Sequence, residues 1–105
     1  MTRRVRITTH AAADFLAIVR YYDDEVADPE ASASLVDALA AKLEHLAGLR
    51  PMVGRPRDDL VPGVRSFAFD DYLLFLRYPE DDSVLEVIAV IHASRDLPAV
   101  FDERQ

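Results

Sequence analysis

The sequence predicts an α+β fold in which a strand, a two-helix hairpin and three further strands follow one another. Two stretches of the first half repeat apolar residues at steps of three and four, the spacing of amphipathic helices. Three β-favouring runs with short connections then follow between residues 64 and 91. We therefore expect an N-terminal strand, an antiparallel helical hairpin packed on a small curved antiparallel sheet (β-α-α-β-β-β), and a short C-terminal helical turn. The 105 residues form one domain, residues 1–105.

The first strand and the first helix are predicted over residues 3–8 and 10–27. Val5 and Ile7 alternate with polar residues, so both point to one face of a strand. Thr8 or Thr9 offers a side-chain oxygen that can cap the helix. Tyr21 is expected to pack in the core or the hairpin. The apolar stripe of this helix consists of Ala12, Phe15, Leu16, Val19, Tyr22 and Val26.

The second helix begins with a strong start signal. Asp28 can cap it, Pro29 suits its first position, and Glu30 suits its first turn. Gly48 can adopt the left-handed conformation that ends helices, so we expect this helix to end there. Only a few residues separate the two helices, so they should lie antiparallel. The stripe of the second helix consists of Val36, Leu39, Ala40, Leu43, Leu46 and Ala47.

The second half of the chain is predicted to be loop and sheet. Residues 49–59 contain two prolines and a glycine, which favour a loop. In the first of the three strands, Arg65, Phe67 and Phe69 share a face. The helices can cover only one face of the sheet, so part of the other face must meet solvent or a partner. The expected segments are strands 64–69, 72–78 and 84–91, a turn at 70–71, a polar turn at 79–83 and a helical turn at 97–101.

Composition excludes several classes of protein. Half of the residues are hydrophobic and none is cysteine, which excludes a disulfide scaffold and a thiolate metal site. The chain has no apolar run of about 18 residues and no apolar signal core near its start, so we expect no membrane span and a cytosolic protein. The net charge of −7 disfavours broad binding to nucleic acid. His10 and His45 lack metal-ligand spacing, so no metal site and no cofactor are expected.

His92 is the first candidate functional residue. It ends the last strand, on the side expected for Ile88 and Val90, and Arg95 follows three residues later. Histidine is suited to proton transfer near neutral pH, so His92 could act as a general acid or base. The simpler interpretation is a histidine that closes a strand by bonding to the backbone.

Four arginines in the middle of the chain form the second candidate. Arg55, Arg57, Arg65 and Arg77 could build an anion-binding patch on the exposed face of the sheet. They could also pair locally with Asp58, Asp59, Asp70 and Asp71, or receive an acidic protein partner.

The sequence resembles the ParE branch of the RelE/ParE family of bacterial type II toxins. The resemblance rests on segments that follow one another in the same order as in the family. They are 5–15 (VRITTHAAADF), 54–60 (GRPRDDL), 62–67 (PGVRSF), 72–78 (YLLFLRY) and 90–97 (VIHASRDL). It implies a toxin that is neutralised by an antitoxin encoded beside it, a ParD-like ribbon-helix-helix protein, in a hetero-oligomer in the bacterial cytoplasm. For ParE members it implies DNA gyrase as the target, with no direct binding to nucleic acid.

The resemblance also implies contact residues. Antitoxin binding is expected at Leu16, Val19 and Tyr22, with Arg57, Arg65 and Arg77 orienting acidic groups of the antitoxin tail. Arg95 is a weaker candidate for target contact.

Two alternatives to gyrase inhibition remain open. A RelE-type member would cut messenger RNA on the ribosome, and Arg65, Arg77 and His92 could then be catalytic. The negative net charge favours the gyrase inhibitor, and so does Ala93, because some nuclease relatives have tyrosine at this place. For a gyrase inhibitor, no catalytic residue is expected. A degenerate toxin would bind antitoxin only.

Overall fold

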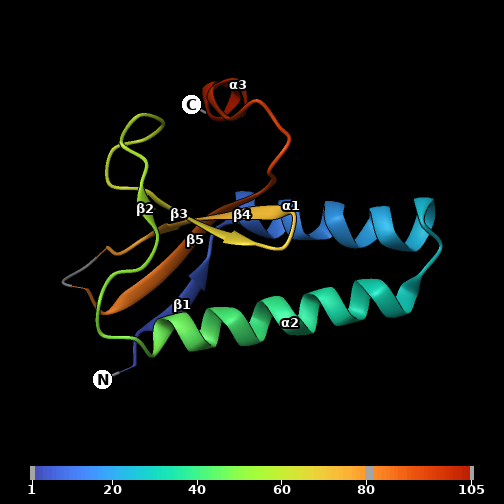
Figure 1. Cartoon of the computed structure of the whole chain (residues 1–105), viewed down its shortest axis with the longest axis horizontal. Helices are drawn as coiled ribbons and strands as arrows, with labels where there is room; N and C mark the ends of the chain where they lie inside the picture. Colours follow the sequence, from blue (N-terminus) through green and yellow to red (C-terminus); the bar gives the residue numbers. More distant parts are fainter. Residues whose placement is uncertain (1, 80–81, 105) are drawn as a thin grey trace.

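The computed structural model of the protein describes residues 2–79 and 82–104. The predicted α+β fold is confirmed, with a helical hairpin beside a five-stranded sheet and a short helix at the C-terminal end (Figure 1). The elements are β1 (Arg4–Ile7), α1 (Thr9–Arg20), the wider helical turn η1 (Tyr21–Glu25), α2 (Pro29–Ala47), β2 (Arg55–Pro56), β3 (Arg65–Phe69), β4 (Tyr72–Arg77), β5 (Val84–His92) and α3 (Leu97–Glu103).

The sheet has the strand order β1-β5-β4-β3-β2 and is mixed rather than wholly antiparallel. The predicted meander β3–β4–β5 is antiparallel, but β1 runs parallel to β5. Strands about 80 residues apart are not joined by a turn, so no local signal determines their relative direction. The segment expected to be loop contains β2, whose two residues extend the sheet beyond β3.

Side-chain caps begin all three α-helices. Thr8, Asp28 and Asp96 accept hydrogen bonds from the backbone N–H three residues ahead, at 3.2, 3.1 and 3.3 Å. The first helix is regular only to Arg20 and continues to Glu25 as a π-helical turn. The hairpin then turns through Ala27, which has a positive φ of 56°. Of the expected polar turn at 79–83, residues 80 and 81 lie outside the described residues.

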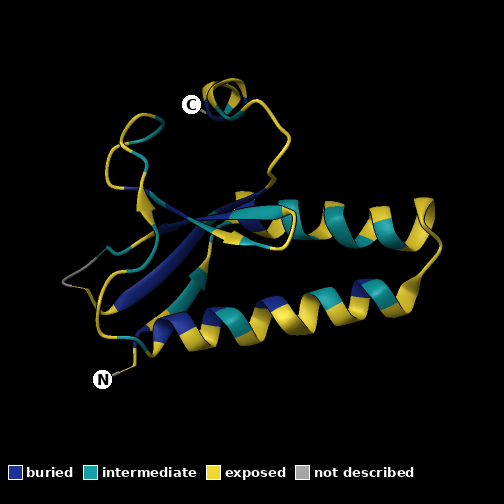
Figure 2. Ribbon diagram, in the orientation of Figure 1, coloured by how far each residue is buried: buried dark blue, intermediate teal, exposed yellow. Residues whose placement is uncertain are grey.

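Each face of the sheet has its own hydrophobic cluster, and Figure 2 shows the buried residues concentrated on the sheet and on the sides of the helices that face it. The larger cluster joins α1 and α2 to one face and includes the predicted Leu39, Leu43 and Leu46. The smaller cluster lies on the other face, where Val100 and Phe101 of α3 cover Phe75. Part of the face expected to be open is therefore covered by the C-terminal helix.

A β-bulge changes which residues of β5 face the helices. Phe75 pairs with Ala89 whereas Leu76 pairs with Val87, so Ile88 is an extra residue in β5. Val90 consequently lies in the helix-side cluster and Ile88 in the other one. The expectation that His92 shares a face with both was wrong for Ile88, because the bulge reverses the alternation between them.

Among the described residues, no helix combines the length and the apolar character needed to cross a membrane.

Candidate functional site

An open apolar groove runs between the two hairpin helices. Its volume is about 490 Å³ and its lining is almost entirely hydrophobic. Leu16 and Val36 are 49% and 37% exposed, and Ile7 of β1 is 44% exposed at one end. These side chains form a contiguous apolar surface that solvent can reach. The residues that line it are Ile7, Ala12, Phe15, Leu16, Val19, Val36, Ala40 and Leu43.

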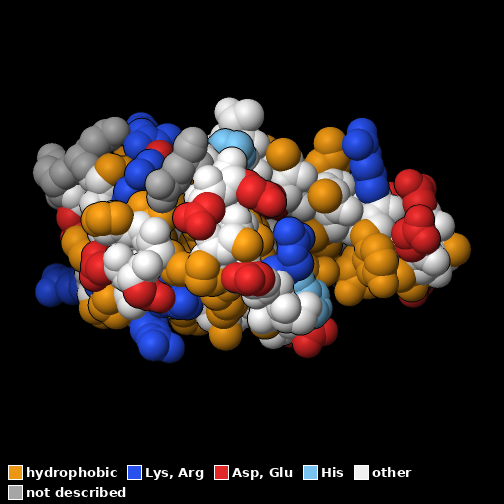
Figure 3. Space-filling model, turned by 90° about the horizontal axis from the view of Figure 1, so that it is seen from above, with side chains coloured by type: hydrophobic (Ala, Val, Ile, Leu, Met, Phe, Trp, Pro, Cys, Tyr) orange, Lys and Arg blue, Asp and Glu red, His pale blue; other side chains and the backbone are white. Residues whose placement is uncertain are grey.

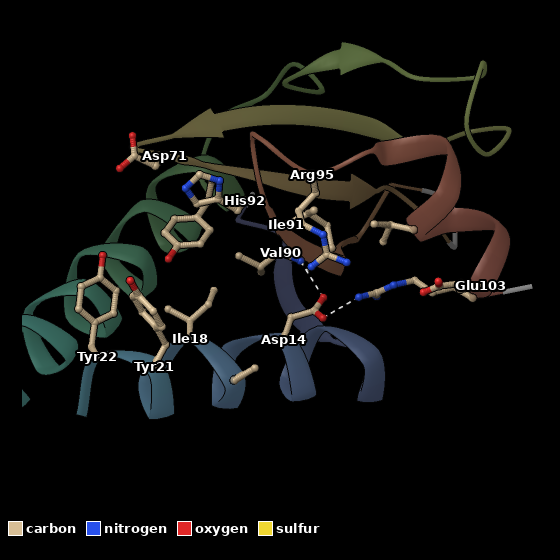
Figure 4. A pocket seen from close by; sticks show the side chains of 14 residues that line it. Asp14, Ile18, Tyr21, Tyr22, Asp71, Val90, Ile91, His92, Arg95 and Glu103 are labelled. Atoms are coloured by element: carbon tan, nitrogen blue, oxygen red, sulfur yellow. Dashed lines mark hydrogen bonds and ion pairs between the residues drawn. The ribbon is translucent and has the colours of Figure 1, made fainter. Parts of the chain in front are cut away.

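A second hollow, of about 690 Å³, lies on the other side of α1. We call it the cleft; it is bounded by α1 and η1, by the adjoining ends of β4 and β5, and by α3 (Figure 4). Tyr22, His92 and Arg95, which the sequence assigned to three separate roles, all line it. Three carboxyl groups (Asp14, Asp71 and Glu103) and two arginines (Arg95 and Arg104) give its lining a slight negative balance.

Asp14 holds together the inner end of the cleft. Its Oδ2 accepts the Val90 N–H at 3.0 Å, and its Oδ1 accepts Arg104 Nη2 at 2.6 Å. The carboxylate therefore ties α1 to β5 and to the residue that follows α3. Sequence reasoning missed this role, because a single aspartate in an early helical turn is equally consistent with a favourable interaction with the helix dipole.

Tyrosine side chains gather at the outer end of the cleft. The Tyr21 and Tyr22 ring centroids are 5.5 Å apart with an interplanar angle of 83°. Burial, together with the nearby Tyr22, Asp71 and Tyr21, raises the pKa of Tyr72 to about 12. The Tyr72 phenol therefore keeps its proton at neutral pH. Tyr21, expected to be packed away, is 54% exposed.

His92 is held by the turn that follows it. Its Nδ1 accepts the Ser94 backbone N–H at 3.1 Å and lies 2.7 Å from Ser94 Oγ. A nitrogen that accepts the backbone N–H carries no proton, so the proton of the neutral ring is on Nε2. The ring also packs edge-on against Tyr72, with centroids 5.4 Å apart. These contacts match the simpler interpretation of His92 as a residue that closes the strand.

The structure does not bring together Arg65, Arg77 and His92. Arg65 pairs with Leu76, a residue of the helix-side cluster, so the adjacent Arg77 projects from the opposite face. His92 pairs with Tyr72 at the other end of β4, five residues or about 17 Å from Arg77.

The central arginines bond mainly to groups of the chain itself. Arg57 pairs with Asp59 at 3.1 Å, as local pairing predicted, and Arg65 Nε donates to the Val53 carbonyl at 3.0 Å. Arg77 instead binds Glu86, with Nε 2.9 Å from Oε1. Because Arg65 and Arg77 lie on opposite faces, these residues do not form the single anion-binding patch that the sequence allowed.

Glu86 is buried between two arginines. It is 5% exposed, and Arg6 Nε approaches its Oε2 at 2.6 Å while Arg77 approaches Oε1. Burial acts to raise the pKa of Glu86, but the hydrogen bonds and charges of Arg77 and Arg6 outweigh it, so the pKa lies below its ordinary value. Within the described parts of the chain, no group of three or more histidine and acidic side chains could hold a metal ion.

Comparisons with known proteins locate the chain among toxins. A family model described as the ParE toxin of the type II toxin–antitoxin system parDE matches residues 5–97. No curated protein sequence matches the chain. A structure from the chromosomal ParDE system of P. aeruginosa superposes with a TM-score of 0.72 at 22% identity, over 87% of this chain and 96% of that one.

A second similar structure comes from the RelBE2 toxin–antitoxin complex of Mycobacterium tuberculosis. Its TM-score is 0.59 at 24% identity, and the match covers 88% of this chain and 99% of that one. At these identities the two structures support the fold, whereas the family model identifies the family.

Proposed function

Because the chain belongs to the ParE toxin family of type II toxin–antitoxin systems, we propose that a cognate antitoxin neutralises it by covering the α1–α2 groove, and that the free chain inhibits DNA gyrase. The exposed apolar groove carries the antitoxin part of this proposal. Leu16 and Val19, two of the six residues expected to bind antitoxin, line it. An amphipathic segment that lays its apolar face into a groove of this kind buries the exposed side chains of both partners.

The antitoxin that fits this surface is a ParD-like protein with an amphipathic C-terminal tail. Such a tail can remain disordered until it binds, and it then covers a large surface. Arg57, Arg65 and Arg77 are proposed to orient its acidic groups by charge-assisted bonds. Tyr22 lies on the other side of α1, so a tail would reach it only beyond the groove.

Gyrase inhibition is proposed as a protein–protein effect in the bacterial cytoplasm. Arg65, Arg77 and His92, the residues expected to be catalytic in a nuclease, lie too far apart to act on one phosphate. The net charge of −7 also disfavours approach to a ribosome. Arg95, which is exposed and lines the cleft, remains the proposed target contact.

DNA supercoiling by purified gyrase tests the proposal. We expect the isolated chain to inhibit supercoiling, and the neighbouring antitoxin to restore it. Leu16→Glu should preserve inhibition but weaken antitoxin rescue by at least about 100-fold, because a carboxylate would have to be buried in an apolar contact. Met52→Glu is the matched control, since Met52 is 45% exposed but lies outside the groove.

Two results would contradict the proposal. If a folded chain stops growth without inhibiting supercoiling, gyrase is not the target, and cleavage of ribosome-bound message becomes the next measurement. If Leu16→Glu and Met52→Glu impair rescue equally, the antitoxin does not use the groove.

A further inference from the structure

The outer end of the cleft has the composition of a site for a cationic side chain. Tyr21 and Tyr22 come from η1, and Tyr72 comes from the start of β4, so three aromatic rings from two distant segments meet there. The rings of Tyr21 and Tyr22 stand nearly at right angles, which presents two walls to the same space. Figure 4 shows both side chains projecting from η1 toward the strands, with Asp71 on the opposite side.

Exposed carboxylates neighbour the tyrosines in both segments. Asp23, Asp24 and Glu25 follow the two tyrosines directly in η1, and Asp70 and Asp71 form the turn between β3 and β4. All five are exposed. Figure 3 shows acidic side chains gathered at one end of the long axis beside a group of hydrophobic ones. These five carboxylates outnumber Arg20, the exposed basic residue directly before Tyr21, so the local balance of charge is negative and favours a positive ligand.

Both arginines of the cleft lie away from the tyrosines, whereas the His92 ring packs edge-on against Tyr72. Arg104 is bound to Asp14 at the inner end, and Figure 4 shows Arg95 on the same side as Asp14. The Tyr72 phenol, whose pKa is raised to about 12, adds no charge of its own at neutral pH. The outer end thus combines neutral aromatic faces with a carboxylate rim, which are the two parts of a cation–π site.

We propose that this outer end, formed by Tyr21, Tyr22, Tyr72 and Asp71, binds an arginine side chain presented by an exposed segment of a partner protein. The planar guanidinium can stack on a tyrosine face while its N–H groups donate to Asp71, a combination that the compact ammonium of lysine matches less well. The site lies across α1 from the apolar groove, so the inference does not depend on antitoxin binding or on the proposed target.

Binding of short peptides to the full chain tests this inference by NMR. The probe is Ac-Gly-Ser-Arg-Ser-Gly-NH2, and the controls replace its arginine with lysine or glutamate. We expect the arginine peptide to shift the ring signals of Tyr21, Tyr22 and Tyr72 in a saturable way, the lysine peptide to bind more weakly, and the glutamate peptide to leave these signals unchanged. Raising the salt concentration should weaken binding.

Matched variants separate the site from general charge attraction. Tyr21→Ala and Asp71→Asn should each weaken the arginine peptide roughly two- to fivefold, as expected for a partly exposed cation–π contact or ion pair. Asp37→Asn removes the same charge from an exposed position on α2 and should change affinity little. Arg95→Gln should strengthen binding by relieving repulsion, whereas an anion site would be weakened by it. Circular dichroism of each variant checks that the fold is retained.

Three outcomes would overturn the inference. One is equal binding of the arginine and glutamate peptides. Another is an unchanged affinity in folded Tyr21→Ala. The third is a concentration-dependent dimer, seen by sedimentation and lost in Tyr21→Ala, which would mean that a second copy of the chain occupies the site.

Discussion

At the residue scale, the strongest polar contacts belong to residues that maintain the fold. Arg3 is 7% exposed and pairs with Asp82 at 2.7 Å. It also donates to the carbonyls of Leu49 and Arg50, and its guanidinium lies 4.6 Å from the Tyr78 ring centroid. One side chain near the N-terminus thereby fastens the end of α2 to the start of β5. Nothing in the run of arginines at residues 3, 4 and 6 distinguishes Arg3, because its partners come from distant segments.

Arg3→Ala should destabilise the chain by about 3 kcal/mol, because it leaves the Asp82 carboxylate and three backbone carbonyls (of Leu49, Arg50 and Asp82) without their donor. Arg4→Ala is the control, since Arg4 is exposed beside it and should change stability by less than about 0.5 kcal/mol. Urea unfolding at neutral pH measures both values. Equal losses in the two variants would show that the Arg3 network contributes little.

Glu86→Gln should remove a pH-dependent part of the stability. The pKa of Glu86 in the folded chain lies below its ordinary 4.5, because of hydrogen bonds from Arg77 and Arg6. The stabilisation is therefore fully present above about pH 4.5 and is lost as the pH falls through the lower folded-state value. At pH 7 we expect the free energy of unfolding of the variant to be about 2 kcal/mol lower than that of the wild type. This loss is smaller than for a fully buried ion pair, because the two arginines are partly exposed.

Denaturant unfolding between pH 3 and 7 checks this expectation. The difference between the wild-type chain and Glu86→Gln should shrink as the pH falls below 4.5. Glu44→Gln, at an exposed position on α2, serves as the control and should follow the wild-type curve. A difference that stays constant across the range would show that Glu86 acts by packing alone.

At the element scale, the outermost strand depends on one glycine. Gly54 has a φ of +94°, and a Cβ there would lie 2.8 Å from the Ser66 carbonyl oxygen. Ser66 is the residue of β3 that pairs with Arg55, so the close approach is part of the pairing of β2 with β3. The glycine that the sequence identified as a loop marker is in practice what allows a strand to form directly after it.

Gly54→Ala should therefore destabilise the chain by about 2–3 kcal/mol, through backbone strain together with a clash against a backbone atom. Gly63→Ala is an informative control, because Gly63 has a φ of +79° but a Cβ added there would meet no atom within 4 Å, so it should cost only about 1 kcal/mol. Thermal unfolding of the two variants separates strain from clash. If both variants cost the same, the contact with Ser66 is relieved by a shift of the strand.

At the scale of the whole molecule, the hairpin leaves more apolar surface than the sheet can cover. The chain measures 42 × 32 × 21 Å, and Figure 1 shows α1 and α2 extending past the strands along the longest dimension. The part of the hairpin beyond the sheet has no third layer to pack against. Leu16 and Val36 are consequently exposed in the groove, although each belongs to an apolar stripe that the sequence reveals clearly.

Antitoxin binding should therefore raise the stability of the chain. A partner that binds only the folded state adds about 2.7 kcal/mol when its free concentration is 100 times its dissociation constant. We expect a higher melting temperature for the mixture, measured by calorimetry, and no such rise for Leu16→Glu at the same concentrations. The Met52→Glu chain should behave like the wild type, and a rise in both variants would exclude the groove as the contact.

Features that depend on neighbours along the chain could be predicted from residue order alone. Helix caps at Thr8 and Asp28, the apolar stripes, the meander of three strands and the family resemblance are all local signals, and each was readable from spacing and residue type. They were sufficient to predict the α+β fold and to place Leu16 and Val19 on an apolar surface.

Features that depend on contacts between distant segments were decided only by the tertiary structure. The parallel pairing of β1 with β5, the reversal of faces at Ile88 and the separation of Arg65 from Arg77 follow from strand register and from one bulge. The cleft likewise joins α1, η1, the ends of β4 and β5, and α3, and so collects residues that the sequence had assigned to different roles. Register and packing are set by free-energy differences summed over many weak contacts, and no short stretch of sequence contains that sum.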